Sequence, residues 1–168
     1  SISVGAGGVI TLTGPDGVDT ATNVEFCQFD DQTVCAEDLL PVTLASDSLT
    51  ITRGLQSGLK AEVLLANDGL PGGYTVVGVR NVVDATVELV GGRLHITATG
   101  PNASFEYLAD GPDGRKAGAV SVATLVSTNV VDNLSGGAAT AADLQGQNGN
   151  DTLTGTAGQD RLVGGLGN

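Results

Sequence analysis

The C-terminal end of the chain carries the side chains whose types and spacing suggest a definite chemistry. Leu144, Leu153 and Leu162 are nine residues apart, and Asp151 and Asp160 stand two residues ahead of the last two leucines. Glycine fills much of the sequence between them. Carboxylate oxygens and the backbone carbonyls of glycine-rich turns are the hard ligands that Ca2+ prefers, in shells of roughly six to eight oxygens. The spacing therefore predicts a calcium site built from repeated loops.

The repeated units begin at Gly146, Gly155 and Gly164, and glycine returns at the fourth position of each unit. A loop of this composition can turn tightly because glycine adopts positive φ without steric cost. The three residues that follow each loop, with leucine at their centre, are expected to form a very short strand. Two units then make one coil of a parallel β-roll, in which the leucines stack along the axis.

This pattern resembles the RTX, or hemolysin-type, calcium-binding nonapeptide repeat, whose consensus is Gly-Gly-x-Gly-x-Asp-x-apolar-x. The resemblance implies that Asp151 and Asp160 donate carboxylate ligands to Ca2+. Gln147 and Thr156 replace the second glycine, so the first two units depart from the consensus. The resemblance also implies that loop residues complete the shells through their carbonyl groups, and these residues are Gly146, Asn148, Gly149, Gly155, Gly158, Gly164 and Gly167.

The unit that precedes these repeats is degenerate, because Asp143 directly precedes Leu144 and the middle glycine is missing. We expect it to be a weak or empty site, or the cap of the roll. In the RTX family a calcium site is shared by loops one coil apart. The partner loop of Asp151 would then continue past Asn168, so residues 129–168 are expected to hold only half of the Asp151 site. Composition alone also allows a flexible linker, but the common register of glycine, aspartate and leucine favours the repeat.

The charge of the chain is consistent with a cation as its partner. Nineteen acidic residues against seven basic ones give a formal net charge of −12, which disfavours nucleic acids and anionic membrane surfaces. Membrane insertion is not expected, since no run approaches the roughly 18 apolar residues that a spanning helix needs. The N-terminus lacks the regions of a signal peptide, and without an initiator Met the chain is expected to be a segment of a longer polypeptide.

Three regions of different composition must position these loops. Residues 1–45 are expected to form a few strands that flank the repeats, residues 46–128 a separate domain, and residues 129–168 the truncated repeats. In the middle region, apolar and polar residues alternate in short runs separated by turn-forming Gly, Asn, Asp and Pro, which predicts a β-sandwich. The runs are SLTITR, AEVLL, YTVVGV, ATVELV, RLHITA, SFEYL and GAVSVATL.

The middle region resembles bacterial cadherin-like domains of the VCBS type, through its LLAND opening, the ATVEL and GGRLHITA strands and the segment SFEYLADGPDGRKAGAVSVATL. With 26 glycines, aromatic residues at 3 % and many Val, Ile, Leu and Thr residues, the composition predicts an all-β chain. The resemblances imply a cadherin-like or Ig-like β-sandwich followed by the start of the β-roll. Alternation places Leu94 and Ile96 inside and His95 toward solvent. The family often carries further acids after its Asn-Asp pair, whereas Asn67 and Asp68 lead into GLPGG, so a turn is favoured over a calcium ligand.

The N-terminal region resembles segments that flank RTX blocks, through GPDGVDTATNVEFCQFDDQTV. Cys27 and Cys35 would face each other if a three-residue turn closes a hairpin between them, and a disulfide would then contribute about 2 to 3 kcal/mol. Two small core residues are the alternative. Four aspartates are expected in solvated turns, with cation binding as the alternative: Asp16, Asp19, Asp30 and Asp31.

Catalysis within these residues is not expected. His95 is the only histidine, and an exposed histidine on an alternating strand is a poor candidate for a nucleophile–histidine–carboxylate triad. The sequence contains neither a P-loop nor a complete dinucleotide-binding fingerprint. With aromatic residues at 3 % of the chain, we expect no aromatic cleft for sugar rings.

The RTX resemblance implies a calcium-binding module of a secreted bacterial protein, extracellular or at the cell surface, exported by type I secretion and folded on calcium outside the cell. The sandwich would then serve adhesion or spacing, with a cell-surface protein or carbohydrate as its partner. The alternative is the accessory region of a secreted peroxidase, protease or lipase whose catalytic domain lies outside this segment.

Overall fold

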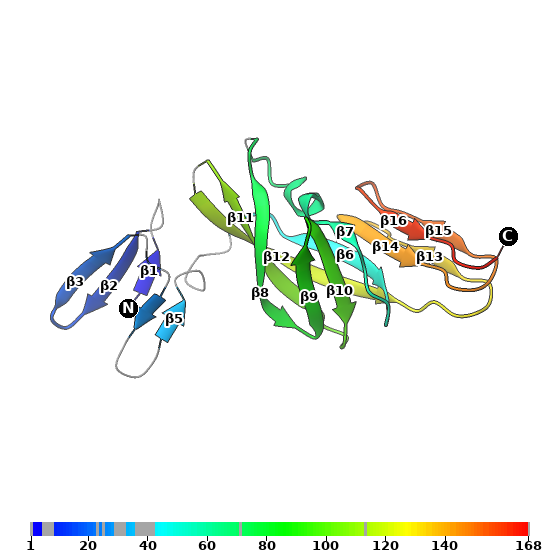
Figure 1. Ribbon diagram of the computed structural model, residues 1–168, viewed down its shortest axis with the longest axis horizontal. Helices are drawn as coiled ribbons and strands as arrows, with labels where there is room; N and C mark the ends of the chain where they lie inside the picture. Colours follow the sequence, from blue (N-terminus) through cyan, green and yellow to red (C-terminus); the bar gives the residue numbers. More distant parts are fainter. Residues whose placement is uncertain are drawn as a thin grey trace.

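Regular structure is almost entirely β, which confirms the all-β prediction (Figure 1). The one helix among the described elements is a short 3-10 helix, and no described helix is long and apolar enough to cross a membrane. The residues that the computed structural model describes are 2–4, 9–22, 24, 26–28, 33–35, 43–70, 72–112 and 114–167.

Two sheets between Asp47 and Leu125 enclose one apolar core. The smaller sheet consists of β7 (Leu59–Lys60), β10 (Arg93–Ala98) and β9 (Ala85–Val90). The larger sheet includes β6 (Asp47–Thr52), β12 (Gly114–Leu125), β11 (Ser104–Gly111) and β8 (Thr75–Val83). Most of their strands come from the alternating runs of the middle region, and burial alternates along β9 and β10, where every second side chain faces the core.

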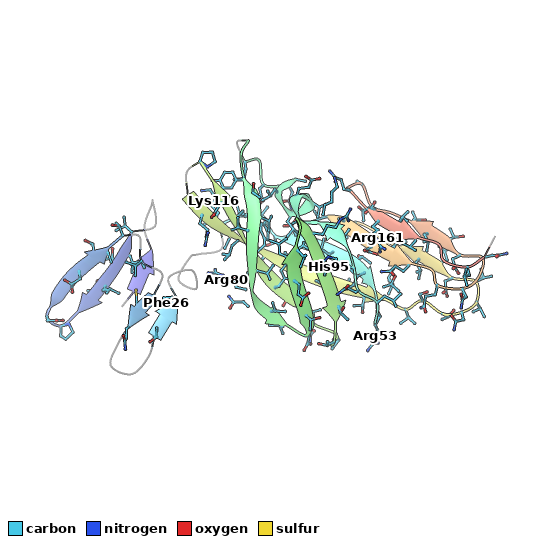
Figure 2. The ribbon with its side chains drawn as sticks, viewed as in Figure 1. Phe26, Arg53, Arg80, His95, Lys116 and Arg161 are labelled. Carbon is cyan, nitrogen blue, oxygen red and sulfur yellow. The ribbon has the colours of Figure 1, made fainter. Side chains whose placement is uncertain are left out.

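The core of this sandwich follows the alternation of the sequence. Leu94 and Ile96 of β10 are fully buried, as predicted, and His95 between them is half-buried on the other face of the strand (Figure 2). Phe105 and Tyr107 of β11 belong to the same buried cluster. Apolar surface removed from water, at about 25 cal/mol per Å2, holds the two sheets together.

The run AEVLL is not a strand, contrary to the prediction. It forms the 3-10 helix η3 (Ala61–Leu65), in which Ala61, Val63 and Leu64 are buried. A short apolar run fits a strand and a buried helical turn equally well, so periodicity alone cannot choose between them. η3 directly follows β7 and precedes the turn at Asp68, and its buried side chains pack against the core.

The larger sheet extends beyond the sandwich into the repeats. The order of its strands is β16-β14-β6-β12-β11-β8, and β14 and β6 pair in parallel. Figure 1 shows the roll, in orange and red, continuing from the sandwich at β6. The predicted boundary between residues 128 and 129 lies between β12 and β13. The six-stranded sheet nevertheless contains strands from both sides of this boundary. The four strands of the roll are β13 (Asn133–Ser135), β14 (Ala141–Gln145), β15 (Thr152–Thr154) and β16 (Arg161–Val163).

The roll has two parallel walls, as expected for stacked nonapeptide units. β13 pairs with β15 in one wall, and β14 pairs with β16 in the other. Between them lies a small cluster in which Leu134 and Leu144 are buried and Leu153 is partly buried. Leu125, at the end of β12, packs on the same cluster, so the sandwich closes one end of the roll.

The N-terminal residues form two small antiparallel sheets, β1 (Ile2–Val4), β2 (Ile10–Gly14) and β3 (Gly17–Ala21), and β4 (Phe26–Gln28) with β5 (Thr33–Cys35). Cys27 pairs with Val34, and Cys35 pairs with Phe26. The expected register, with Cys27 opposite Cys35, is therefore wrong by one residue, and Cys27 is a buried free cysteine. Asp16 and Asp19 belong to the β2–β3 hairpin, where both are exposed, and Asp30 and Asp31 lie outside the described residues.

One buried carboxylate lies at the start of β6. Asp47 is 3 % exposed, and neither of its oxygens has a hydrogen-bond partner in the described part of the chain. Burial raises the pKa of Asp47 to about 6; the polar side chain of Thr140 nearby opposes this in part, and the charge of Asp68 adds to it. The Tyr107 hydroxyl lies 2.9 Å from Asp68 Oδ2 and 3.0 Å from the Leu64 carbonyl, and these two acceptors share its single proton. Burial raises the pKa of Tyr107 as well, so Tyr107 stays a protonated donor.

We expect Asp47→Asn to raise the free energy of unfolding by about 2 to 3 kcal/mol at about pH 7.5 and to leave it nearly unchanged at about pH 4. Because the folded-state pKa of Asp47 lies above its unfolded value, the stability of the native protein falls as the pH rises from about 4 through about 6. Urea unfolding at both pH values, with a calcium chelator present, measures the difference. An equal gain at both pH values would show that the charge of Asp47 is not its cause.

Candidate metal centre

The loops of the roll lie in two stacks, because consecutive loops alternate between its two edges. The first, third and fifth loops form one stack, and the second and fourth loops form the other. In chain order, the five described loops span 127–132, 136–140, 146–151, 155–160 and 164–167.

Backbone hydrogen bonds fix the register of the first stack. The Asp132 amide, at the end of the first loop, donates to Asp151 Oδ1 in the third loop over 2.9 Å. The Gly149 amide of the third loop donates to the Leu166 carbonyl of the fifth loop over 2.8 Å. The Leu166 amide returns a hydrogen bond of 2.8 Å to the Gln147 carbonyl. The third loop is therefore held on both sides.

Asp151 carries an unsatisfied oxygen in the middle of this stack. Its Oδ2 is buried and has no hydrogen-bond partner in the described ranges. A Cβ atom at Gly146 would lie against this oxygen and 2.7 Å from the carbonyl oxygen of Gly164, which explains why glycine is needed there. A carboxylate oxygen and a carbonyl oxygen thus converge on one point between the third and fifth loops. A buried anionic oxygen without a donor is costly unless a cation neutralises it.

The other two loop aspartates are already satisfied by protein donors. Asp132 accepts hydrogen bonds from the Thr128 amide (2.6 Å) and from the Thr128 hydroxyl (3.0 Å). Asp160 accepts from the Thr156 amide and the Thr156 hydroxyl, both at 2.7 Å, and from the Ala142 amide at 2.8 Å. In each of these two loops a threonine hydroxyl donates to the aspartate, so the carboxylate does not need a cation to satisfy its oxygens.

The residue four positions before the aspartate distinguishes the third loop from the other two. Gln147 stands there in place of threonine, and its φ of 69° turns the backbone into the left-handed region. Its side-chain amide donates to the Ser127 carbonyl over 3.2 Å and not to Asp151. The Ser127 hydroxyl in turn donates to the Gly146 carbonyl over 2.7 Å, which joins the first and third loops without a metal ion. Asp151 is therefore the loop carboxylate best placed for a cation.

We expect Thr156→Val to lower the free energy of unfolding of the calcium-free roll by about 1 to 2 kcal/mol, because valine keeps the shape of threonine but cannot donate to Asp160. The hydroxyl also accepts from the Gly158 amide over 3.0 Å, so that amide loses its partner too. Chemical unfolding in a calcium chelator measures the loss. Calcium affinity should stay within about twofold, since the third loop is untouched; a larger change would place Thr156 in the calcium site.

The residues that the sequence predicts as ligands form two groups and not one site. Asp160 lies in the second stack with Gly155 and Gly158, where its oxygens are occupied. The Asn148 side chain of the third loop donates to Asn129 Oδ1 over 3.0 Å, so that side chain faces the first loop. Asp151 lies in the first stack, whose predicted ligand residues are Gly146, Asn148, Gly149, Gly164 and Gly167.

The degenerate unit contributes no loop carboxylate. Ala142, and not Asp143, stands next to Asp160, because the register pairs Asp143 with Arg161. Asp143 is completely buried and accepts from Arg161 Nη1 at 2.9 and 3.1 Å and from the Gly58 amide at 2.7 Å. The strand of this unit, β14, pairs with β6 and thereby joins the roll to the sandwich. Sequence reasoning missed this buried ion pair, since a strand position beside leucine carries no sign of its partner.

The chemistry of the first stack suits calcium. Among the described residues, no three His, Cys, Asp or Glu side chains lie close enough together to hold a metal ion. A cation at Asp151 would therefore rely on one carboxylate and on backbone carbonyls of the third and fifth loops. A ligand set made only of oxygen, with few charges and flexible geometry, favours Ca2+ over zinc and other nitrogen- or sulfur-seeking metals.

Comparison with known proteins bears on the roll. Residues 136–168 match the family model described as RTX calcium-binding nonapeptide repeat (4 copies). The match includes the degenerate unit before Gly146, which the sequence pattern alone left outside the clear repeats. No curated protein and no solved structure matches the chain. The C-terminal roll of this chain therefore carries RTX calcium-binding repeats, and repeats of this kind bind Ca2+.

Proposed function

We propose that the chain is a non-catalytic calcium-binding module of a secreted bacterial RTX-type protein, in which the sandwich serves as an adhesive or spacer element. The observation that carries the proposal is the buried Oδ2 of Asp151, which lacks a partner and lies beside Gly146 and the Gly164 carbonyl. The match of residues 136–168 to the RTX repeat supports the choice of metal.

The sandwich and the loops have different tasks in this proposal. β6 offers β14 a ready edge, and Gln145 donates its amide to the Thr52 hydroxyl over 2.7 Å, so the first coil is ordered by protein contacts alone. The third and fifth loops bring Asp151 and the Gly164 carbonyl to one place. Calcium, when bound, supplies the positive charge that neutralises Asp151 and links these loops.

A calcium titration of the 15N-labelled chain tests this proposal. We expect saturable shifts of the amide signals of 146–151 and 164–167 at millimolar calcium, with little change in β9 and β10. Bound calcium should also raise the free energy of unfolding by about 2.7 kcal/mol at a hundredfold excess over the dissociation constant. Magnesium serves as the matched control, because it demands stricter geometry and gives up its water reluctantly.

Two results would contradict the proposal. One is an absence of saturable change in these loops at millimolar calcium. The other is an equal response to magnesium, which would indicate general screening of the −12 charge and not a site.

A further inference from the structure

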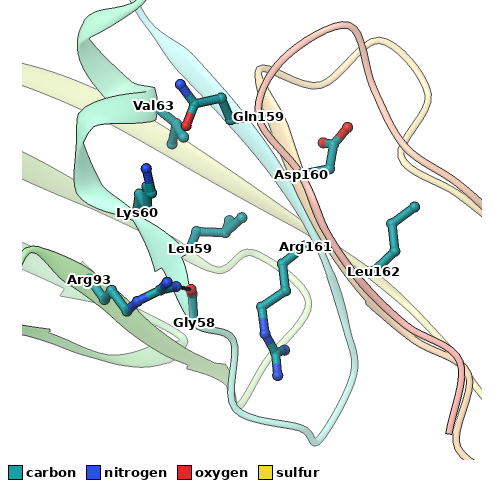
Figure 3. A pocket seen from close by; sticks show the side chains of 9 residues that line it. All are labelled: Gly58, Leu59, Lys60, Val63, Arg93, Gln159, Asp160, Arg161 and Leu162. Atoms are coloured by element: carbon teal, nitrogen blue, oxygen red, sulfur yellow. Dashed lines mark hydrogen bonds between the residues drawn. The ribbon is translucent and has the colours of Figure 1, made fainter.

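A groove of about 420 Å3 lies between the sandwich and the roll (Figure 3). Its volume lies within the range of roughly 300 to 1,000 Å3 that is typical of small-molecule sites. Leu59 and Val63, which belong to the sandwich core, close its base on the sandwich side. Arg161 and Leu162 of β16 line it on the roll side. The roll thus completes a groove that the sandwich alone would not form.

Basic side chains gather at this groove although the chain is strongly acidic. The chain contains seven lysine and arginine residues, and three of them, Lys60, Arg93 and Arg161, line this one groove. Lys60 and Arg93 stand directly opposite each other in the register of β7 and β10. Like charges at directly opposed positions of an antiparallel pair are destabilising unless an anion lies near both. The arrangement therefore favours a bound negative group.

The sandwich side of the groove has cations that a ligand can reach. Lys60 Nζ lies 3.0 Å from Glu62 Oε1, but both side chains are more than half exposed, and such surface pairs contribute little. Arg93 Nη1 donates to the Gly58 carbonyl over 2.6 Å, which fixes the direction of the guanidinium without neutralising it. Figure 3 shows this contact between Arg93 and Gly58.

The roll side adds a third cation in a fixed position. Arg161 Nη1 binds both oxygens of Asp143, which orients the guanidinium toward the sandwich, and its side chain is still 41 % exposed. A guanidinium has five N–H donors, so binding through one nitrogen leaves others for a ligand. Asp160 also lines the groove, but its oxygens accept from Thr156 and Ala142 within the roll.

We propose that this groove binds the carboxylate or sulfate group of a small acidic molecule. The oxyanion lies between Lys60 and Arg93 and is approached by Arg161. Planar guanidinium groups suit carboxylates and sulfates because they donate two parallel hydrogen bonds. The site goes beyond the calcium function, since none of its three cations belongs to a calcium loop.

The test is an NMR titration of the whole 15N-labelled chain with sodium glucuronate, sodium sulfate and neutral glucose, at constant ionic strength and fixed calcium. We expect saturable shifts at Lys60, Arg93 and Arg161 with one or both anions and none with glucose. Arg93→Gln should weaken binding about tenfold. Arg53→Gln is the matched control, because Arg53 is exposed at the end of β6, away from Arg161 (Figure 2), and should leave binding unchanged.

The two anions separate the sources of the charged group. Tighter binding of glucuronate than of sulfate assigns the site to a carboxylate, tighter binding of sulfate assigns it to a sulfate group, and equal binding assigns it to oxyanions in general. Shifts that do not saturate, that spread to Arg53, or that persist unchanged in Arg93→Gln would overturn the proposal. Lys60→Gln provides a second variant whose side chain is exposed, so its effect cannot be attributed to loss of the fold.

Discussion

Asp151→Asn is expected to weaken calcium binding to the roll roughly 100-fold, because among the described residues it is the Asp151 carboxylate that faces the space between the third and fifth loops. The same change should leave the calcium-free protein equally stable or slightly more stable. An asparagine carries no charge to bury, and its amide could donate to the Gly164 carbonyl that now shares this space. The variant therefore separates the two states of the protein.

Isothermal titration with calcium measures the affinity, and urea unfolding with and without a chelator measures both stabilities. Asp19→Asn is the control for the change in net charge, because Asp19 is exposed in β3. Asp160→Asn is the informative comparison: since Asp160 already has three protein donors, we expect its main effect on the calcium-free roll. If Asp160→Asn abolishes calcium binding and Asp151→Asn does not, the assignment of the site is wrong.

Arg161→Met is expected to lower the free energy of unfolding by about 3 kcal/mol, because it leaves the buried carboxylate of Asp143 without its countercharge. Methionine keeps much of the aliphatic packing of arginine, so the loss reports on charge more than on volume. The Gly58 amide remains as a donor to Asp143 and offsets part of the cost. Since Asp143 joins β14, β16 and the sandwich, the roll should unfold first.

The double variant Asp143→Asn/Arg161→Met provides the control. Asparagine at 143 can still accept from the Gly58 amide, and no unpaired charge remains, so most of the lost stability should return. Urea unfolding of the two single variants and the double variant closes the cycle. Equal losses that simply add would show that Asp143 and Arg161 do not interact in the folded protein.

Local features of the roll were open to prediction because their causes lie within a few residues. The nine-residue period sets where each strand and loop falls, and glycine is needed where loops stack closely, as at Gly146. The capping of Asp160 by Thr156 is equally local, four residues apart, and could have been recognised from the sequence. The absence of such a threonine before Asp151 is the sequence signal that separates an open carboxylate from a capped one.

Several expectations failed where a short pattern allows two structures. AEVLL is compatible with a strand and with a 3-10 helix, and it forms the helix η3, in which Ala61, Val63 and Leu64 reach the core. The pairing of Cys27 was wrong by one residue because the register of a hairpin depends on the geometry of its turn. Neither error affects the roll, whose register is set by stacked leucines and loops.

The sequence by itself determined that this chain is all-β, that its middle region alternates and that its end repeats with calcium-binding chemistry, because periodicity and turn composition act locally. Only the tertiary structure decided that β6 pairs with β14, since Ser48 and Thr140 are brought together from positions 92 residues apart and strand edges carry no mark of their partners. It also decided that the Ala142 amide of the preceding coil donates to Asp160, and that Asp143 and Arg161 join the roll to the sandwich. Burial and long-range pairing depend on the whole fold, and so no local pattern contains them.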